Sequence, residues 1–177
     1  EALASPPGSP ARGRYLFRRG RAGGSTPPND WVSVFGGPAW ERVPDGEWYL
    51  HLFAPEQPDL DWTNDEVVEE FHDILRFWMD RGVDGFRIDV AHGMFKAEGM
   101  PDVEAESNTG GIEEAMAQLE RPYWDQPGVH DVYRRWRRVL DVCDRLCIAV
   151  SDAIHSGVIL KARPAYRSIS RFALGPA

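Results

Sequence analysis

The chain has 177 residues, of which 42% are hydrophobic and 7 are tryptophan, and its formal net charge is −8 at pH 7. An acidic chain of this kind is a poor partner for nucleic acid. It contains no run of about 18 or more apolar residues, so we expect no membrane-spanning segment and no membrane partner. The hydrophobic content suffices for a sizeable core in one domain or in part of a larger one. Because the first residue is Glu1 rather than Met, we expect the natural N-terminus to lie upstream.

The two cysteines, Cys143 and Cys147, are four positions apart. This spacing matches neither the redox C-x-x-C motif nor a zinc-ligand pair with partners elsewhere in the chain. We therefore interpret them as core thiols, and we predict no metal site from them. Two unpaired thiols are typical of a reducing compartment, so we expect a cytoplasmic protein.

The first 53 residues change character near residue 31. Residues 1–30 are rich in Gly, Pro, Ser and Arg, which predicts a loop, with the basic cluster at residues 12–21 exposed to solvent. Residues 31–35 and 47–53 are rich in β-branched and aromatic side chains, and residues 44–46 (PDG) predict a turn between them. We expect a small, irregular antiparallel element here.

A helix is predicted from residue 63 onward. Residues 63–66 (TNDE) form a capping-box pattern with Thr63 at the N-cap, and Gly82 is a typical helix end. A strand over residues 83–90 follows at once. The helical stripe consists of Val67, Phe71, Ile74, Leu75 and Trp78.

The next elements repeat this order. After a long loop at about residues 92–111 and a short helix around residues 112–119, an amphipathic helix leads to an apolar strand at residues 146–150. Alternating helices and apolar strands predict an α/β fold with parallel strands. Residues 153–177 show no sustained period. The apolar positions of the second helix are Val129, Val132, Tyr133, Trp136, Val139 and Leu140.

Asp89 ends the first apolar strand, two residues after Arg87. Residues i and i+2 of a strand point to the same side, so the two side chains should project together. An arginine beside an aspartate favours the ionised carboxylate, which is the form a covalent nucleophile for sugar chemistry needs. The same pattern also fits a buried Arg–Asp pair that merely closes a strand.

Asp152 follows the second apolar strand in the same way. Adjacent strands lie about 4.8 Å apart, so two acids at neighbouring strand ends could reach the roughly 5–5.5 Å separation of a retaining glycoside hydrolase. In such a pair one carboxylate attacks the sugar and the other protonates the leaving oxygen. Alternatively, Asp152 caps a helix or closes a turn.

Four motifs together resemble one family. Residues 85–92 (GFRIDVAH) resemble the nucleophile motif of the α-amylase superfamily, glycoside hydrolase family 13. Residues 57–62 (QPDLDW) resemble the QPDLN motif of its α-glucosidase and oligo-1,6-glucosidase branch. Residues 27–40 and 48–53 also look like that branch. The resemblance covers about residues 10–152, and the shared order of the motifs makes it specific.

The resemblance implies a partial (β/α)8 TIM barrel, comprising about strands 4–5 with helices 3–4. Residues 1–62 would be part of the inserted B domain, and residues 63–177 part of the catalytic domain. It further implies retaining hydrolysis of terminal α-linked glucose in short oligosaccharides through a glucosyl–aspartate ester. In this reading Asp89 is the nucleophile, Asp152 stands at the acid/base position, and Arg87, His92 and Phe53 bind substrate. The alternative for His92 is an exposed or helix-capping imidazole.

Three departures from the family pattern qualify these expectations. The family has Glu where this chain has Asp152, and the later H-D motif is absent from residues 153–177. The fifth position of QPDLN is Asp61, as in amylases where that motif contributes to a calcium site, so Ca²⁺ near Asp59 or Asp61 is an alternative to the absence of a cofactor. We therefore predict an incomplete chain without activity of its own. The alternatives are a transglucosylase of the trehalose synthase or amylosucrase type and a non-catalytic remnant.

Overall fold

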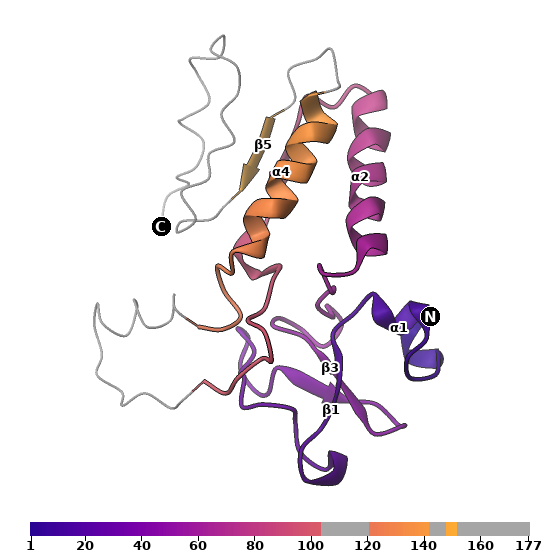
Figure 1. The fold of residues 1–177 in the computed structure, drawn as a ribbon, viewed down its shortest axis with the longest axis vertical. Coiled ribbons are helices and arrows are strands. Elements are labelled where there is room, and N and C mark those ends of the chain that lie inside the picture. Colours follow the sequence, from indigo (N-terminus) through magenta and orange to yellow (C-terminus); the bar gives the residue numbers. More distant parts are fainter. Residues whose placement is uncertain (104–120, 142–147, 152–177) are drawn as a thin grey trace, which may run out of the picture.

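The computed structural model describes residues 1–103, 121–141 and 148–151. The first part of the chain forms a three-stranded antiparallel sheet, and the later part forms two helices with a pair of parallel strands. The antiparallel sheet lies beside the ends at which both helices begin (Figure 1). No helix in the described ranges is long and apolar enough to cross a membrane. The predicted α/β character is confirmed.

The antiparallel sheet has the order β1-β3-β2, so its longest strand is central. β2 and β3 are joined by the predicted turn, in which Gly46 has a φ of 94°. The predicted strand at residues 31–35 is wrong, because that segment forms only an isolated bridge between Val32 and Pro38. Gly36 and Gly37 both have positive φ and turn the chain back immediately after residue 35. The strands are β1 (Phe17–Arg19), β2 (Trp40–Arg42) and β3 (Glu47–Leu50).

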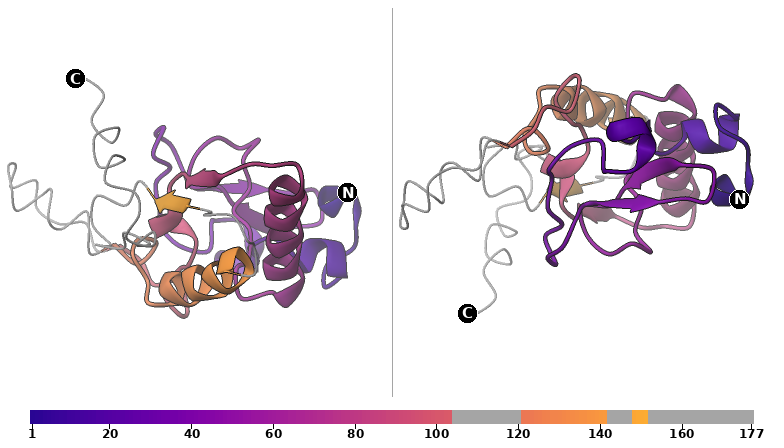
Figure 2. Two further views of the ribbon diagram at one scale, coloured as in Figure 1. Left: turned by 90° about the horizontal axis from the view of Figure 1, so that it is seen from above. Right: turned by 90° about the horizontal axis from the view of Figure 1, so that it is seen from below.

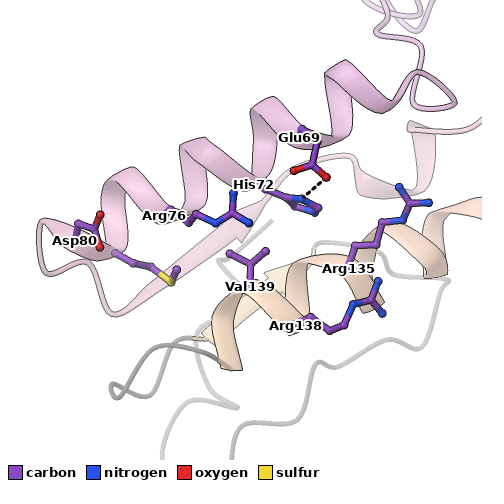
Figure 3. Close-up of a pocket in the computed structure, with 8 residues that line it drawn as sticks. Glu69, His72, Arg76, Asp80, Arg135, Arg138 and Val139 are labelled. Atoms are coloured by element: carbon purple, nitrogen blue, oxygen red, sulfur yellow. Dashed lines mark ion pairs between the residues drawn. The ribbon is translucent and has the colours of Figure 1, made fainter.

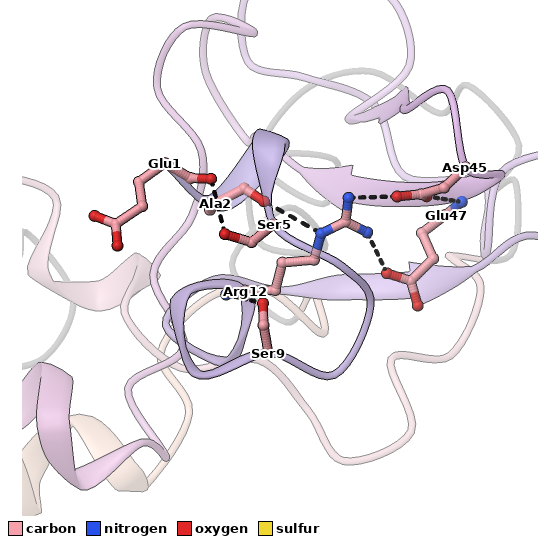
Figure 4. A network of polar contacts seen from close by, with 7 residues as sticks. All are labelled: Glu1, Ala2, Ser5, Ser9, Arg12, Asp45 and Glu47. Atoms are coloured by element: carbon pink, nitrogen blue, oxygen red, sulfur yellow. Dashed lines mark hydrogen bonds and ion pairs between the residues drawn. The ribbon is translucent and has the colours of Figure 1, made fainter.

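The prediction that residues 1–30 form a loop is also wrong, and the predicted exposure of the basic cluster holds for Arg18, Arg19 and Arg21 but not for Arg12. This segment contains β1, the short helix α1 (Pro10–Gly13) and a buried cation, Arg12, that is 3% exposed. The Arg12 guanidinium donates to Asp45, in the turn before β3, and at 2.8 Å to Glu47, the first residue of β3 (Figure 4). The hydrogen bond that Arg12 donates to Asp45 raises the pKa of Arg12 against the effect of burial, and the same bond lowers the pKa of Asp45. Arg12 therefore attaches the N-terminal segment to the sheet.

Helix α2 (Asp65–Asp80) begins one residue later than its capping pattern indicated. Asn64 is the N-cap, and its side-chain oxygen accepts the Glu66 amide at 2.8 Å. Thr63, the predicted cap, instead donates its hydroxyl to Asp61 at 2.6 Å. Asn64 satisfies one of the free amides of the first turn, so the helix start is fixed by a local side chain.

The end of α2 confirms the prediction for Gly82. Its φ is 89°, its amide donates to the Met79 carbonyl at 2.9 Å, and the Val83 amide donates to the Trp78 carbonyl at 3.2 Å. These two bonds form a Schellman motif, which satisfies the last carbonyls and reverses the chain into the next strand.

The apolar pattern of the sequence predicts the buried face of one long helix better than that of the other. Helix α4 (Gly128–Asp141) buries five of its six predicted apolar residues, and Val139 is half-buried. In α2 the prediction was wrong for Ile74 and Trp78, which are 41% and 47% exposed. The buried face of α2 turns toward α4 instead, because the two helices pack against each other. Its buried residues are Val67, Val68, His72, Leu75 and Met79.

Strands β4 (Gly85–Ile88) and β5 (Ile148–Ser151) pair in parallel, as predicted, with Ile88 opposite Ser151. Phe86 and Ile88 of β4 pack against core residues of α2 and α4. Figures 1 and 2 show α2 and α4 side by side and running in the same direction, with β5 beside α4 and running in the opposite direction. The predicted short helix at 112–119, both cysteines and residues 153–177 lie outside the described residues.

Candidate active site

Asp89 comes directly after β4, at the end of the strand that faces the antiparallel sheet. The Arg87 Nη2 atom lies 3.3 Å from Asp89 Oδ1, which confirms that the two side chains project to the same side. Both are well exposed, at 67% and 68% of the side chain, so this is not the buried pair of the alternative interpretation. Because the pair is exposed to solvent, it contributes little to folding stability. For the same reason the Asp89 carboxylate is accessible to a ligand.

The turn after Asp89 holds an unusual backbone conformation. Val90 has a φ of 48° and a ψ of 33°, in the left-handed region that β-branched residues rarely adopt. It precedes the 3-10 turn Ala91–Gly93, where the Asp125 amide donates to the His92 carbonyl at 2.8 Å. Strained residues of this kind persist where surrounding contacts enforce them, and they concentrate at functional sites.

Phe53 and His92, both predicted to bind substrate, come together through Trp124. The ring centroids of His92 and Trp124 are 4.7 Å apart, and those of Phe53 and Trp124 are 6.4 Å apart. Phe35 extends this aromatic cluster, with its ring 5.7 Å from Phe53 and its side chain 70% exposed. Sugar rings present apolar faces, so an aromatic cluster of this kind suits a carbohydrate ligand.

Sequence reasoning missed Trp124 and Phe35 as members of the site. The signal for Trp124 lies at Gly93, where a Cβ atom would come within 2.5 Å of the Trp124 ring. Only glycine leaves room for that ring, but this becomes visible only when the two loops are placed together. The signal for Phe35 is its position directly before Gly36 and Gly37, which turn it outward.

A cavity of about 400 Å³ lies at the C-terminal end of β4. Phe53, Arg87 and Asp89 all line it, so the structure brings three of the predicted site residues to one space. His92 is not among the residues that line this cavity, and its ring contacts Trp124 beside it. Asp152, the fifth predicted site residue, lies outside the described residues. The remaining lining is mostly apolar and includes Trp62, Phe71, Phe86, Ile88, Met94 and Trp136.

The geometry around Asp59 does not fit calcium. Lys96 Nζ donates to Asp59 Oδ1 at 2.7 Å and to the Gly93 carbonyl, and the Leu52 amide donates to Asp59 Oδ2 at 2.7 Å. Calcium needs about six to eight oxygen ligands. Within the described ranges, no three His, Cys, Asp or Glu residues are grouped so that they could hold a metal ion. An ammonium already neutralises Asp59, and Asp61 accepts from Thr63.

Lys96 is almost fully buried, with 4% of its side chain exposed. Burial lowers the pKa of its ammonium, and the neighbouring Asp59 carboxylate opposes that shift. Its two acceptors belong to different segments, because Asp59 follows β3 and Gly93 follows β4. Lys96 therefore joins the loop that carries Phe53 to the turn that carries Asp89 and His92.

Comparison with known proteins gives curated relatives that are glucosidases. The chain is 41% identical over 148 residues to an oligo-1,6-glucosidase of Parageobacillus thermoglucosidasius, covering 82% of this chain and 25% of the relative. It is 44% identical over 129 residues to an α-glucosidase of Culex pipiens, covering 72% of this chain and 22% of the relative. The chain thus spans about a quarter of the length of these relatives.

Solved structures with the same fold include hydrolases and transfer enzymes. Trehalose-6-phosphate hydrolase of Bacillus licheniformis matches with a TM-score of 0.69 and 30% identity, covering 84% of this chain and 25% of that protein. An α-glucosyl transfer enzyme, XgtA, matches with a TM-score of 0.69 and 34% identity, covering 80% and 28%. The family model for the α-amylase catalytic domain matches residues 2–165, beyond both ends of the resemblance seen in the motifs. The chain belongs to the α-amylase catalytic-domain family.

Proposed function

We propose that this chain supplies part of the active site of a retaining α-glucosidase, with Asp89 as the nucleophile. The observation that carries the proposal is the position of Asp89 directly after a parallel strand, on a cavity that Arg87 and Phe53 also line. The substrate class would be short α-linked glucose oligosaccharides, in keeping with the names of the glucosidase relatives. Carbohydrate catabolism is the corresponding cellular role.

The proposed reaction needs two carboxyl groups. A free oxygen of Asp89 attacks the anomeric carbon while Asp152 protonates the departing oxygen, and water later hydrolyses the ester with Asp152 acting as base. Arg87 would hold the other Asp89 oxygen, and His92 and Phe53 would border the bound sugars. The pairing of Ile88 with Ser151 supports this arrangement, because Asp89 and Asp152 come next in their segments.

We infer the wider architecture from the same family membership. β4 and β5 would be the fourth and fifth strands of a TIM barrel, with α2 and α4 as its third and fourth helices. Residues 1–62 would form part of a B domain and residues 63–177 part of the catalytic domain. Two parallel strands connected through α4 support the first inference, and the separate antiparallel sheet supports the second.

Transglucosylation is the second candidate function. It is favoured by the structural similarity to an α-glucosyl transfer enzyme and to trehalulose synthase. Both reactions pass through the same glucosyl–aspartate ester and differ in whether water or a sugar receives the glucose. Product analysis with and without a sugar acceptor separates them. A non-catalytic remnant is the third candidate, and it predicts no ester at all.

The nucleophile can be tested in a chimera. The matching segment of the Parageobacillus oligo-1,6-glucosidase is replaced by this chain, and the chimera is treated with a mechanism-based α-glucosidase inactivator. Peptide mass spectrometry should find the label on Asp89. Asp89→Asn should abolish labelling, whereas Asp84→Asn, an exposed aspartate before the same strand, should not. Label on another residue would refute the assignment. The 177-residue chain alone should show no turnover.

The composition of the chain supports a proposal for its location and partners. We propose a reducing, cytoplasmic compartment on the basis of the two cysteines, which lie outside the described residues. We propose an oligosaccharide as the ligand. We propose no nucleic-acid partner because the net charge is −8, and no membrane partner because the sequence contains no run of about 18 apolar residues.

A further inference from the structure

A second hollow lies between α2 and α4, away from Asp89. It has a volume of about 750 Å³, and α2 lines it with Glu69, His72, Arg76 and Asp80. Arg135 and Arg138 line it from α4, with Val139 between the helices (Figure 3). We call this hollow the interhelical groove. None of these residues belongs to the proposed glucosidase site, so the groove calls for a separate account.

His72 is the buried polar group of the groove. The residue is 7% exposed, its Nδ1 atom lies 3.3 Å from Glu69 Oε1, and its Nε2 atom has no hydrogen-bond partner. A buried polar atom without a partner costs folding free energy, so such an atom in a native structure points to a missing ligand. Figure 3 shows the His72 ring directed from α2 toward α4.

The arginines around His72 have spare hydrogen-bonding capacity. Arg76 pairs with Asp73 at 2.8 Å through one nitrogen, and Arg135 pairs with Asp65 at the longer distance of 3.6 Å. In the part of the chain that the structure describes, no ion pair engages Arg138. Guanidinium groups bind phosphate oxygens through two parallel hydrogen bonds, and apolar walls strengthen such bonds. Val139 and Met79 supply such walls.

We propose that the interhelical groove binds a phosphate-class oxyanion, held by Arg76, Arg135 and Arg138 and by the buried His72. Arg138 has no ion pair in the described part of the chain, and Arg76 and Arg135 each engage a carboxylate through one nitrogen only, so guanidinium N–H groups remain for an anion. The unpartnered Nε2 atom of His72 supplies a further polar contact for the anion, beside the three guanidinium groups.

The test is calorimetric titration of the purified chain at constant ionic strength. Inorganic phosphate represents a free ion and glycerol 3-phosphate a phosphomonoester, and the one that binds more tightly indicates the natural class of ligand. Chloride serves as the non-specific anion. The double variant Arg135→Gln/Arg138→Gln should weaken binding at least about tenfold. Arg134→Gln on the same helix is the matched control, because Arg134 is exposed and does not line the groove.

His72→Gln provides a second readout. It should weaken the binding of inorganic phosphate, because it removes the buried ring whose Nε2 atom has no hydrogen-bond partner. A proton resonance of one histidine ring should shift on titration and disappear in His72→Gln. The proposal is overturned if the wild-type chain shows no saturable binding of any oxyanion. Equal weakening by Arg134→Gln and by the double variant would also overturn it.

Discussion

Lys96→Met tests whether the buried ammonium holds the two halves of the site together. Methionine fills a similar volume but leaves Asp59 charged, 14% exposed and without its counter-ion. Breaking a buried ion pair by removing one partner costs about 3–5 kcal/mol. A domain of this kind is stable by only about 5–15 kcal/mol, so the loss should be large. Urea unfolding followed by tryptophan fluorescence measures it directly.

The matched control is Arg134→Met. Arg134 pairs with Asp131 at 2.6 Å, close to the 2.7 Å of the Lys96–Asp59 pair, but the side chains of Arg134 and Asp131 are each 68% exposed. An exposed pair contributes about 0–1 kcal/mol, so this variant should be nearly neutral. Adding Asp59→Asn to Lys96→Met should recover most of the lost stability, because no buried charge is then left. Equal costs for the two methionine variants would refute the reasoning, as would a double variant no more stable than the single one.

The pH dependence of the wild-type chain gives an independent check. Because the pKa of Lys96 is lowered in the folded state, the unfolded chain binds the additional proton at pH values between the lowered pKa and the usual value of about 10.4. Stability should therefore rise with pH across that window. Lys96→Met removes this lysine, so its stability should lack that rise.

Three further predictions address the site and the N-terminal sheet. In the chimera, Asp152→Glu should raise turnover by on the order of 10²-fold, because it restores about an ångström of reach toward the leaving oxygen. Asp45→Asn should lower the melting temperature at neutral pH but flatten its decline below about pH 4, since the lowered pKa of Asp45 stabilises the fold only while Arg12 faces a carboxylate. Gly93→Ala should cost about 1–3 kcal/mol and shift the fluorescence of Trp124, whose ring occupies the space of the added methyl group.

Each of these three has a control and a contradicting outcome. Asp152→Asn should not raise turnover, and no gain with glutamate would mean that reach does not limit the reaction. Asp73→Asn, in an exposed pair, should leave the acid limb of the melting curve unchanged. Gly13→Ala has a nearest neighbour at 3.6 Å and should be tolerated. If Gly93→Ala is equally tolerated, the proposed packing of Trp124 is wrong.

The elements that were predicted correctly depend on local chemistry. Gly82 ends α2 because its own backbone adopts a left-handed conformation, and Asp89 projects with Arg87 because strand geometry alone requires it. The misses arise from contacts across long stretches of chain. Nothing near Arg12 in the sequence indicates its burial, because its two carboxylate partners, Asp45 and Glu47, lie more than 30 residues away. Lys96 is likewise identified only when its acceptor, Asp59, has been placed.

The segment at residues 100–103 is attached to the start of the chain by bonds that span 70 residues or more. The Trp31 indole donates to the Pro101 carbonyl at 2.8 Å, and the Val103 amide donates to Asp30 at 2.7 Å. Such contacts close large loops, whose entropy must be lost before the bonds can form. The helix–strand unit around α2 and β4 should therefore fold first. The aromatic cluster around Phe53 and Trp124 should assemble last. A limited proteolytic cut between residues 53 and 59 would then separate Phe53 from the turn beyond Asp89 and leave the helical layer intact.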